Sequence, residues 1–484
     1  MTTATLPVRH KTLPCRLHCR KVSADINLAS ISETFSYLPD ATIIGGNPAK
    51  ANADGFSYWA AKPKEIFEFQ AKEIKPFEKL QRTLLRYRLR ENLQTDLPKG
   101  IFTGGWMGLF GYELGGYIER LPEPPFNDLK MPLIRLCFYD CLVAYDHSKN
   151  NFWLIALELS DDIETCEEKL AWLENLLLKA RDVAVTQPTP ADLDNIDFLK
   201  IRSNMCRNYY FKAFEKIKRH IYDGDVYQIN FSQRFNCDFN ARPIDLFHWQ
   251  NQYNPSPYSA YIDAGDLQIV SASPEMFVTI NQGAISTKPI KGTRRRIEET
   301  SQAAKQTNAE NLKELLNSEK EQAELNMIID LERNDIARIS VPGTRCVSQP
   351  RTIETYPTVF HAVATISGEL RDTVTFCDIL KAMFPGGSIT GAPKIRSMQI
   401  ISQTEPTARG VYTGSIGFVG LDGNVSLNIT IRTIIIKDKM AYAQTGGGIV
   451  ADSDPQAEYD ETLIKARALL AGIDAVKQKT PNND

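Results

Sequence analysis

The chain has 484 residues, of which 43% are hydrophobic, and a formal net charge of −3 that is made up of many charges of both signs. A chain of this size can bury a large core as one extended or two closely associated domains, and its balanced charge gives no basic stripe of the kind that binds nucleic acid. No run approaches 18 apolar residues and the start lacks a charged-then-apolar signal pattern, so we expect a cytoplasmic protein without membrane spans.

The first part of the sequence is rich in strand patterns and ends in a helix expected over residues 164–179. A polar, proline-bearing linker follows at 182–194. It predicts two domains, an N-terminal β-rich domain over 1–190 and a motif-rich catalytic domain over 195–478. The second domain opens with a helix expected over 210–222, where apolar residues recur at helical spacing. Further along, strands and helices alternate without the βαβ rhythm of a doubly wound sheet.

A β-hairpin with a glycine-bearing loop is predicted over residues 276–286, because the sequence alternates on both sides of Asn281-Gln282-Gly283. Its two antiparallel strands would bring Glu275 and Lys291 to the same end of the hairpin. A carboxylic acid beside an amine is what covalent addition–elimination chemistry requires. An exposed ion pair of little energetic value is the other interpretation of these two residues taken alone.

Two pairs of glutamates have the spacing that places both carboxylates of a pair on one face of a helix. They are Glu321 with Glu324, and Glu458 with Glu461. Two such helices facing each other would offer four carboxylates to Mg²⁺, a hard cation that prefers oxygen ligands. Helix capping explains part of the pattern equally well, since Ser318 and Asp454 stand where N-cap residues are expected.

Glycine-rich segments occur twice and would let backbone N–H groups approach an anion closely. One is Gly446-Gly447-Gly448, which follows a strand-like run, and the other is the loop 384–394, which is expected to open a helix. Neither matches a nucleotide-binding motif, and a pair of tight turns would also explain them. Arg432 interrupts the apolar strand pattern of 429–434 and needs an anionic partner if it points inward.

Several long motifs, taken in order, resemble those of the chorismate-utilising enzymes. This family includes component I of anthranilate synthase, component I of aminodeoxychorismate synthase, and the isochorismate and salicylate synthases. The resembling segments are residues 289–293, 327–335, 387–394, 409–417 and 446–455, with a fainter match at 104–113. The resemblance implies an α+β fold like that of anthranilate synthase component I, in which large antiparallel β-sheets are layered with helices.

Two positions favour an amine-forming, lysine-using member of this family. Aminodeoxychorismate synthases carry a lysine where Lys291 stands in Pro-Ile-Lys-Gly-Thr, whereas anthranilate synthases typically carry alanine. At Gln228 the isochorismate and salicylate synthases carry the lysine that activates water, and glutamine cannot act as a base at neutral pH. Lys288 and Arg295 depart from the arginine and proline that are usual beside the motif, which puts the local geometry in doubt.

The resemblance therefore implies aminodeoxychorismate synthase component I, which converts chorismate and ammonia to 4-amino-4-deoxychorismate in 4-aminobenzoate and folate biosynthesis. Anthranilate synthase component I is the alternative, and a non-catalytic regulator that binds chorismate or tryptophan is a third possibility. The chain carries no glutaminase signature. The resemblance thus implies a separate glutaminase (amidotransferase) subunit as the source of ammonia.

Site roles also follow from the resemblance. Lys291 would be the nucleophile and Glu275 the proton donor, which requires a lowered lysine pKa and a raised carboxyl pKa. The implied substrate-binding residues are Arg432, Tyr412, Thr293, His361, Gly446, Gly447 and Gly448. The implied ligands of the cofactor Mg²⁺ are Glu321, Glu324, Glu458 and Glu461. A lone histidine such as His361 is otherwise more often a core residue.

A tryptophan-binding effector pocket is a weaker implication. Its walls would come from Ser32 in segment 27–33 and from Pro257, Tyr258 and Ser259 in segment 254–259. Ordinary turn residues explain both segments equally well.

Overall fold

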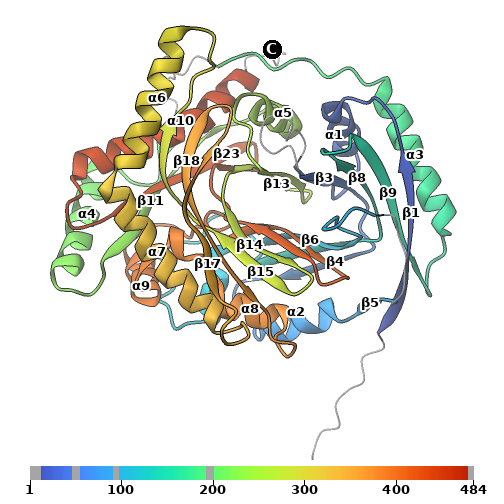
Figure 1. The fold of residues 1–484 in the computed structure, drawn as a ribbon, viewed down its shortest axis with the longest axis horizontal. Coiled ribbons are helices and arrows are strands. Elements are labelled where there is room, and N and C mark those ends of the chain that lie inside the picture. The colour runs from blue at the N-terminus through green and yellow to red at the C-terminus, as the bar shows by residue number, and fades with distance from the viewer. Residues whose placement is uncertain (1–11, 46–54, 91–96, 192–200, 478–484) are drawn as a thin grey trace, which may run out of the picture.

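Two large β-sheets form the body of the molecule, and helices lie around their outer sides (Figure 1). The computed structural model describes residues 12–45, 55–90, 97–191 and 201–477. The sheets have 13 and 10 strands, and every strand pair is antiparallel except β1 with β5. This arrangement is the α+β fold that the resemblance implied.

The 13-stranded sheet contains strands from both ends of the sequence. In spatial order they are β10 (Arg202–Ser203), β11 (Gln228–Asp238), β23 (Met440–Ile449), β22 (Thr433–Lys437), β13 (Leu267–Ser273), β12 (Tyr258–Asp263), β2 (Thr42–Ile44), β3 (Phe56–Ala60), β8 (Cys141–Asp146), β9 (Asn151–Leu159), β1 (Leu13–Val22) and β5 (Tyr87–Leu89), with β19 (Gly391–Ala392) paired to β11.

The 10-stranded sheet carries the predicted hairpin near one edge. Its strands are β16 (Ile290–Arg295), β18 (Val359–Glu369), β15 (Ala284–Lys288), β14 (Met276–Asn281), β21 (Val425–Asn428), β20 (Ser415–Gly420), β6 (Gly105–Phe110), β7 (Ile134–Tyr139) and β4 (Glu65–Phe69), with β17 (Cys346–Thr355) paired to β18.

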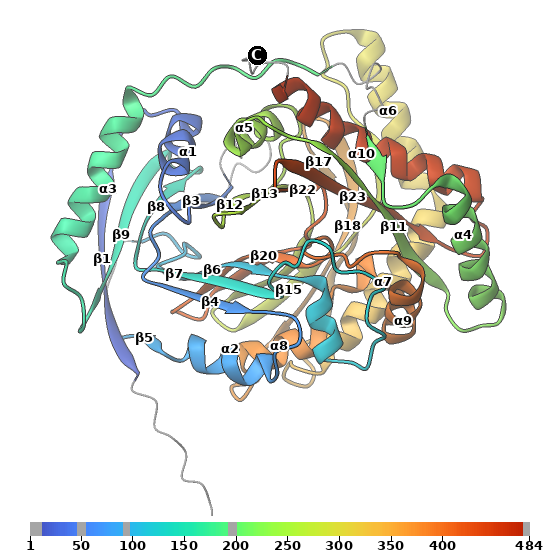
Figure 2. The same ribbon diagram turned by 180° about the vertical axis from the view of Figure 1, so that it is seen from behind.

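The helices follow the apolar periodicity of the sequence. They are α1 (Leu28–Ser36), α2 (Pro76–Leu84), α3 (Cys166–Arg181), α4 (Arg207–Tyr222), α5 (Pro243–Tyr253), α6 (Gln302–Asn317), α7 (Glu319–Ala337), α8 (Phe376–Met383), α9 (Lys394–Thr404) and α10 (Pro455–Lys477), with 3₁₀ turns η2 (Tyr112–Tyr117) and η4 (Gly387–Ile389). Helix α3 packs on β9, and α10 packs on β23 and α5 (Figure 2). Within the described part of the chain, no helix combines the length and apolar character needed to span a bilayer.

The predicted division at 190–195 does not separate the sheets. Strand β2 pairs with β12, and β6 pairs with β20, so residues from both predicted domains share both sheets. The segment after α3 lies against α5, where its Thr189 carbonyl accepts a hydrogen bond from Trp249 Nε1 at 3.0 Å. The two predicted domains are therefore parts of one packed body.

The predicted hairpin is confirmed as β14–β15. Asn281 pairs with Ala284, and the two loop residues, Gln282 and Gly283, have positive φ angles of 51° and 83°. Both values suit the tight turn that joins right-twisted strands. The far end of the hairpin, where Met276 pairs with Lys288, is the end that carries the candidate catalytic residues.

Candidate active site

A bulge in β16 sets the position of Lys291. Ile290 pairs with Val363 and Thr293 with His361, so three steps along β16 match two along β18. Gly292 occupies this bulge with φ +95°, a conformation that L-residues rarely adopt. The irregularity turns Lys291 out of the ladder, and its Nζ donates a hydrogen bond to the Ser388 carbonyl oxygen at 3.1 Å.

Glu275 lies beside this segment, as the hairpin geometry predicts. Its side chain is buried, and its Oε1 accepts a hydrogen bond from the Ile290 amide at 3.4 Å. Burial raises the pKa of Glu275, although the charges of Lys291 and Arg432 partly offset the rise. Burial lowers the pKa of Lys291, against the opposing pull of Glu324 and Glu275. Both directions are those that an amine nucleophile and a proton donor need at neutral pH.

Helix α7 brings the first pair of glutamates to the Lys291 strand. Ser318 caps the helix by accepting a hydrogen bond from the Glu321 amide at 3.4 Å. Glu321 Oε1 accepts a hydrogen bond from Arg294 Nη1 at 2.7 Å, whereas its Oε2 is buried and has no hydrogen-bond partner. Glu324 is the charge that most strongly opposes deprotonation of Lys291.

Helix α10 presents the second pair to strand β23. Asp454 caps this helix, as predicted, because its Oδ1 accepts hydrogen bonds from the amides of Gln456 and Ala457 at 3.0 and 2.9 Å. Glu458 is buried and accepts a hydrogen bond from Ser453 Oγ at 2.6 Å, and Glu461 forms an ion pair with Lys465 at 2.6 Å. A Cβ built on Gly447 would lie 2.9 Å from Glu458 Oε2 and 3.8 Å from Glu461 Oε1, so both carboxylates border this glycine.

The four glutamates match Mg²⁺ in chemistry. All of them offer hard oxygen donors, and the unpartnered buried oxygen of Glu321 is the kind of group that a cation would satisfy. In the part of the chain that the structure describes, no three acidic, histidine or cysteine side chains converge closely enough to hold a metal ion. Three of the four instead contact Arg294, Ser453 and Lys465, so magnesium binding stays a prediction.

The three glycines continue strand β23 and do not form tight turns. Strand β22 pairs only with residues 440–443, so no described strand pairs with the other edge of β23 along the glycines, and Lys465 Nζ donates a hydrogen bond to the Gly446 carbonyl oxygen at 3.0 Å. Any Cβ here would collide, because at Gly446 it would lie 2.6 Å from the Phe231 carbonyl oxygen and at Gly448 2.3 Å from Gln228 Nε2. Gln228 is buried, and both of its amide heteroatoms lack a partner.

Arg432 is placed differently from its predicted position inside a strand. It precedes β22 with φ +49°, and it forms no ion pair with any described residue. Burial lowers its pKa, and the Glu275 charge opposes this effect. A guanidinium without an internal partner is suited to a substrate carboxylate.

His361 contacts the predicted substrate-binding residue Thr293. Its Nδ1 shares a hydrogen bond of 2.8 Å with Thr293 Oγ1, and its Nε2 is buried without a partner. Burial, helped by the positive charge of Arg432, lowers the pKa of His361 to about 3. The imidazole is therefore neutral at physiological pH and offers a hydrogen bond rather than a charge.

Tyr412 belongs to a buried network around Arg409. The Arg409 guanidinium lies 5.6 Å from the Tyr412 ring centroid and forms an ion pair with Glu405 at 2.7 Å. Burial raises the pKa of Tyr412 to about 12, so the phenol stays protonated. The network fixes the turn that carries Tyr412 against β11, since Arg409 Nη2 also donates to the Asn230 carbonyl at 2.7 Å.

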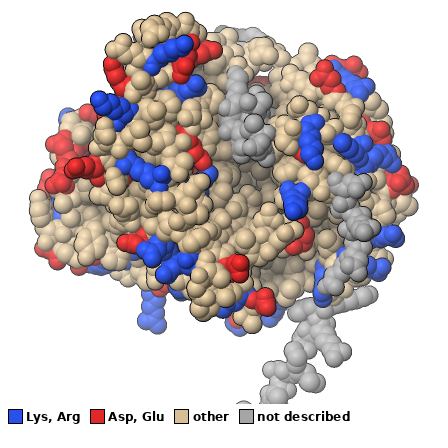
Figure 3. All heavy atoms as spheres, viewed as in Figure 1, with Lys and Arg blue, Asp and Glu red and all other residues tan. Residues whose placement is uncertain are grey.

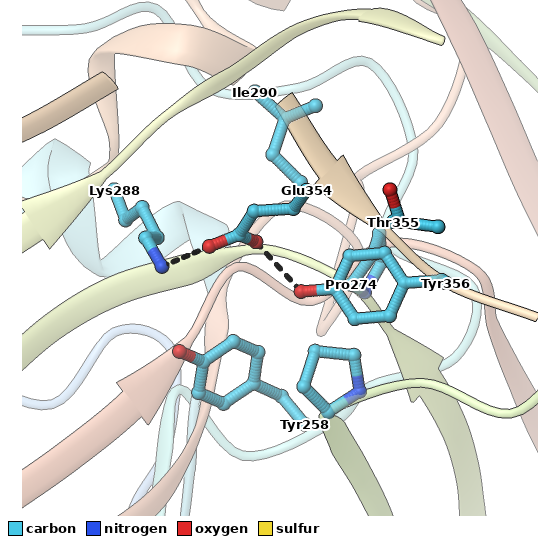
Figure 4. A pocket seen from close by; sticks show the side chains of 8 residues that line it. Tyr258, Pro274, Lys288, Ile290, Glu354, Thr355 and Tyr356 are labelled. Atoms are coloured by element: carbon cyan, nitrogen blue, oxygen red, sulfur yellow. Dashed lines mark hydrogen bonds and ion pairs between the residues drawn. The ribbon is translucent and has the colours of Figure 1, made fainter. Parts of the chain in front are cut away.

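Lys288 faces a cavity of about 270 Å³ next to the site (Figure 4). It forms an ion pair with Glu354, and the other oxygen of that carboxylate accepts a hydrogen bond from the Tyr356 hydroxyl at 2.7 Å. Pro274 and Ile290, the chain neighbours of Glu275 and Lys291, line the same cavity. Lysine at position 288, where arginine is usual in the family, therefore keeps a positively charged side chain at this cavity.

Three of the four predicted effector residues line two different cavities. Pro257 and Tyr258 border the cavity of Figure 4, whereas Ser32 lines a second one of about 140 Å³ near α1 and α5. The Ser32 hydroxyl already accepts a hydrogen bond from Trp59 Nε1 at 2.9 Å, and Ser259 Oγ donates to the Ser256 carbonyl at 2.9 Å. Tryptophan binding stays a prediction.

Glu332 is a buried acidic residue of this region that was not among the predicted site residues. It follows Ile328 by one helical turn on the inner face of α7 and is 5% exposed. The position of Glu332 on the same stripe as Ile328, Ile329 and Ile336 is the sequence signal that would have shown its burial.

Comparisons with known proteins identify the family of this chain. The model of the chorismate binding enzyme family matches residues 48–471. Aminodeoxychorismate synthase component 1 of Bacillus subtilis is 37% identical over 379 residues, which cover 78% of this chain and 79% of that protein. Anthranilate synthase component 1 of Acetivibrio thermocellus is 38% identical over 388 residues, covering 78% and 76%.

The fold comparison gives the same result. The crystal structure of anthranilate synthase component I from Streptococcus pneumoniae TIGR4 matches with a TM-score of 0.72 and 30% identity, covering 86% of this chain and 92% of that one. The family match spans most of the sequence and the relatives exceed 30% identity over most of their length. This chain therefore belongs to the family of chorismate-binding enzymes.

Proposed function

We propose that this protein is an aminodeoxychorismate synthase component I, which aminates chorismate through a covalent bond to Lys291. The observation that carries the proposal is the pair formed by a partly buried lysine with a lowered pKa and a buried glutamate with a raised pKa. The position of Lys291 in Pro-Ile-Lys-Gly-Thr supports this choice over a lysine-free relative.

The proposed first half of the reaction forms one bond and breaks another. The uncharged Lys291 Nζ adds to the ring carbon next to the one that bears the carboxylate. The electron pair moves through the diene, and the carbon–oxygen bond of the distant hydroxyl breaks as Glu275 supplies the proton that makes it water. Lys291 is then bonded to the ring as a secondary ammonium group, and Glu275 is ionised.

The second half restores both residues. Ammonia adds at the vacated carbon, the Lys291–carbon bond breaks, and its electrons return to Nζ. The proton that the new ammonium group loses returns to Glu275. Arg432, which forms no ion pair with a described residue, supports a role in holding a substrate carboxylate, and the glycines, which pair with no described strand besides β11, support the same role.

The carboxylates would bind the cofactor near the ring carboxylate. Mg²⁺, when bound by Glu321, Glu324, Glu458 and Glu461, supplies electron withdrawal from the substrate carboxylate. We also propose a separate glutaminase subunit as the source of ammonia. The relatives' name, component 1, supports such a partner.

Anthranilate synthase is the second candidate, because a relative of that name matches with the same degree of identity. The products separate the two: anthranilate is aromatic and fluorescent, whereas the aminated diacid does not aromatise unaided.

The test incubates the protein with chorismate, Mg²⁺ and ammonium at high pH and identifies products and protein adducts by mass spectrometry. The wild type should yield the aminated diacid and an adduct on Lys291. Lys291→Ala should lose the adduct, and its rate should fall by about a hundredfold or more. Lys288→Ala is the matched control, since this lysine faces the neighbouring cavity and should leave the adduct intact. Normal turnover by Lys291→Ala without any wild-type adduct would disprove the covalent mechanism, and binding without turnover would indicate a regulator.

A further inference from the structure

Glu332 is a buried carboxylate without a cation of its own. Its Oε2 accepts one hydrogen bond, from Thr287 Oγ1 at 3.0 Å, and no lysine, arginine or histidine in the described ranges forms an ion pair with it. The nearby Lys394 is already engaged by Asp335 at 2.5 Å and by the Met383 carbonyl at 2.9 Å. A carboxylate in such a place is costly as an anion, because a single hydroxyl replaces its hydration.

This side chain lies directly behind the catalytic pair. A Cβ built on Gly387 would be 3.6 Å from Glu332 Cγ, and the next residue, Ser388, provides the carbonyl that accepts from Lys291. Thr287, which donates to Glu332, is adjacent in the chain to Lys288, the partner of Met276 at the catalytic end of the hairpin. Glu332 therefore adjoins both segments that carry the reacting groups.

We propose that Glu332 is held as a neutral carboxylic acid and is a positioning residue that keeps the Lys291 amine uncharged. This inference rests on the proposed function of Lys291 as a nucleophile. An anionic Glu332 would add a second negative charge near Nζ and favour the ammonium form, which has no electron pair to donate. A neutral Glu332 leaves the Lys291–Glu275 pair free to exist as amine and acid.

Electrostatics support the geometry. Burial is the main cause that raises the pKa of Glu332, to about 8, and the charge that Glu275 acquires when it gives up its proton adds to this rise. Among the other charged groups that face it, Asp335 raises this pKa further and Lys394 lowers it. The proton is therefore present at neutral pH and is lost above about pH 8, where the ammonium form of Lys291 gains stability.

The test measures the rate of adduct formation on Lys291 with chorismate and Mg²⁺, without ammonia, between about pH 6 and pH 10. Glu332→Gln keeps the side chain neutral at every pH. In this variant the rate of adduct formation should begin to fall at a pH about one unit higher than in the wild type. At a given alkaline pH the variant should therefore react about tenfold faster. Asp330→Asn removes an exposed carboxylate from the same helix and should leave the pH of the alkaline fall in rate unchanged.

Two outcomes would overturn the inference. One is a Glu332→Gln profile that superimposes on that of the wild type, and the other is a loss of more than about a hundredfold at every pH, which would mean that Glu332 itself transfers a proton. Infrared difference spectra provide a second readout that needs no catalysis. At pH 7 the spectrum of the wild type minus that of Glu332→Gln should contain the carbonyl band of one protonated carboxylic acid, beyond the band of Glu275 that both proteins share, and the absence of that difference would refute the neutral state. If the wild type forms no adduct at any pH, the proposed function fails and the infrared result alone decides the protonation of Glu332.

Discussion

Gly292 shows how one residue without a side chain sets the direction of the reactive one. Its φ of +95° opens the bulge that turns Lys291 away from the β16–β18 ladder. Its α-carbon also lies so close to α6 and α7 that an added Cβ would be 2.8 Å from both Leu315 Cδ1 of α6 and Glu321 Oε2 of α7. The glycine of the Pro-Ile-Lys-Gly-Thr motif is thus required by backbone geometry and by the approach of the helix that carries Glu321.

Gly292→Ala should therefore impair catalysis and stability together. The positive φ and the two close contacts should cost about 1–3 kcal/mol in the free energy of unfolding, and the displaced Lys291 should lower kcat/KM by about a hundredfold. Denaturant titration and steady-state kinetics measure the two effects. Gly283→Ala is the control, because Gly283 has φ +83° but nothing within 4 Å of the added Cβ. Equal losses of kcat/KM in both variants would contradict this account.

At the scale of single elements, motif and periodicity predicted most of the strands and helices that carry the candidate site. The hairpin was predictable from alternation around a two-residue turn, and the capping residues Ser318 and Asp454 marked where α7 and α10 begin. The strand course of Gly446, Gly447 and Gly448 was not predictable, since glycine disfavours strands and the requirement comes from contacts with Gln228 and Glu458. The left-handed backbone at Arg432 and the contact of buried Glu332 with Thr287 likewise depend on neighbours distant in the sequence.

Helix α10 supplies a prediction about its first turn. Asp454 accepts hydrogen bonds from the amides of Gln456 and Ala457, and Glu458 lies in the same turn. Asp454→Ala should destabilise the protein by about 0.5–2 kcal/mol. Because the first turn would fray, the variant should also need more Mg²⁺ for half-maximal activity, which titration of Mg²⁺ against initial rate measures.

Ser301→Ala is the matched control for this change. Ser301 caps α6 by accepting a hydrogen bond from the Ala304 amide at 3.1 Å, and α6 carries none of the predicted site residues. It should lower stability by a similar amount without altering the Mg²⁺ requirement. If both variants shifted the Mg²⁺ titration equally, general destabilisation would explain the result and α10 would have no special role.

At the scale of the whole molecule, the site depends on sheets that both ends of the chain build together. Lysine, arginine, aspartate and glutamate side chains are interspersed over the face shown in Figure 3. Beneath the surface, buried apolar side chains from both parts of the chain pack together. The largest buried cluster joins Trp106 and Phe138 from the first part to Phe231 and Ile449 from the second. The polar segment 182–194 predicted a division into two domains because composition can indicate a linker but does not reveal how the strands on its two sides pair.

We therefore expect the chain to unfold as one cooperative unit. Ile43 pairs with Tyr261 and Leu109 with Ile416, so unfolding either part would leave strand edges and apolar side chains of the other exposed. Tryptophan fluorescence reports mainly on the first part, which holds four of the five tryptophans, Trp59, Trp106, Trp153 and Trp172. Far-UV circular dichroism reports on the whole chain. The two urea transitions should coincide, and residues 195–478 expressed alone should bind a hydrophobic dye and give no sharp transition. Two separate transitions, or a cooperatively folding fragment, would show that the second segment is an independent domain and that Lys291 and Glu275 are held in place without the N-terminal strands.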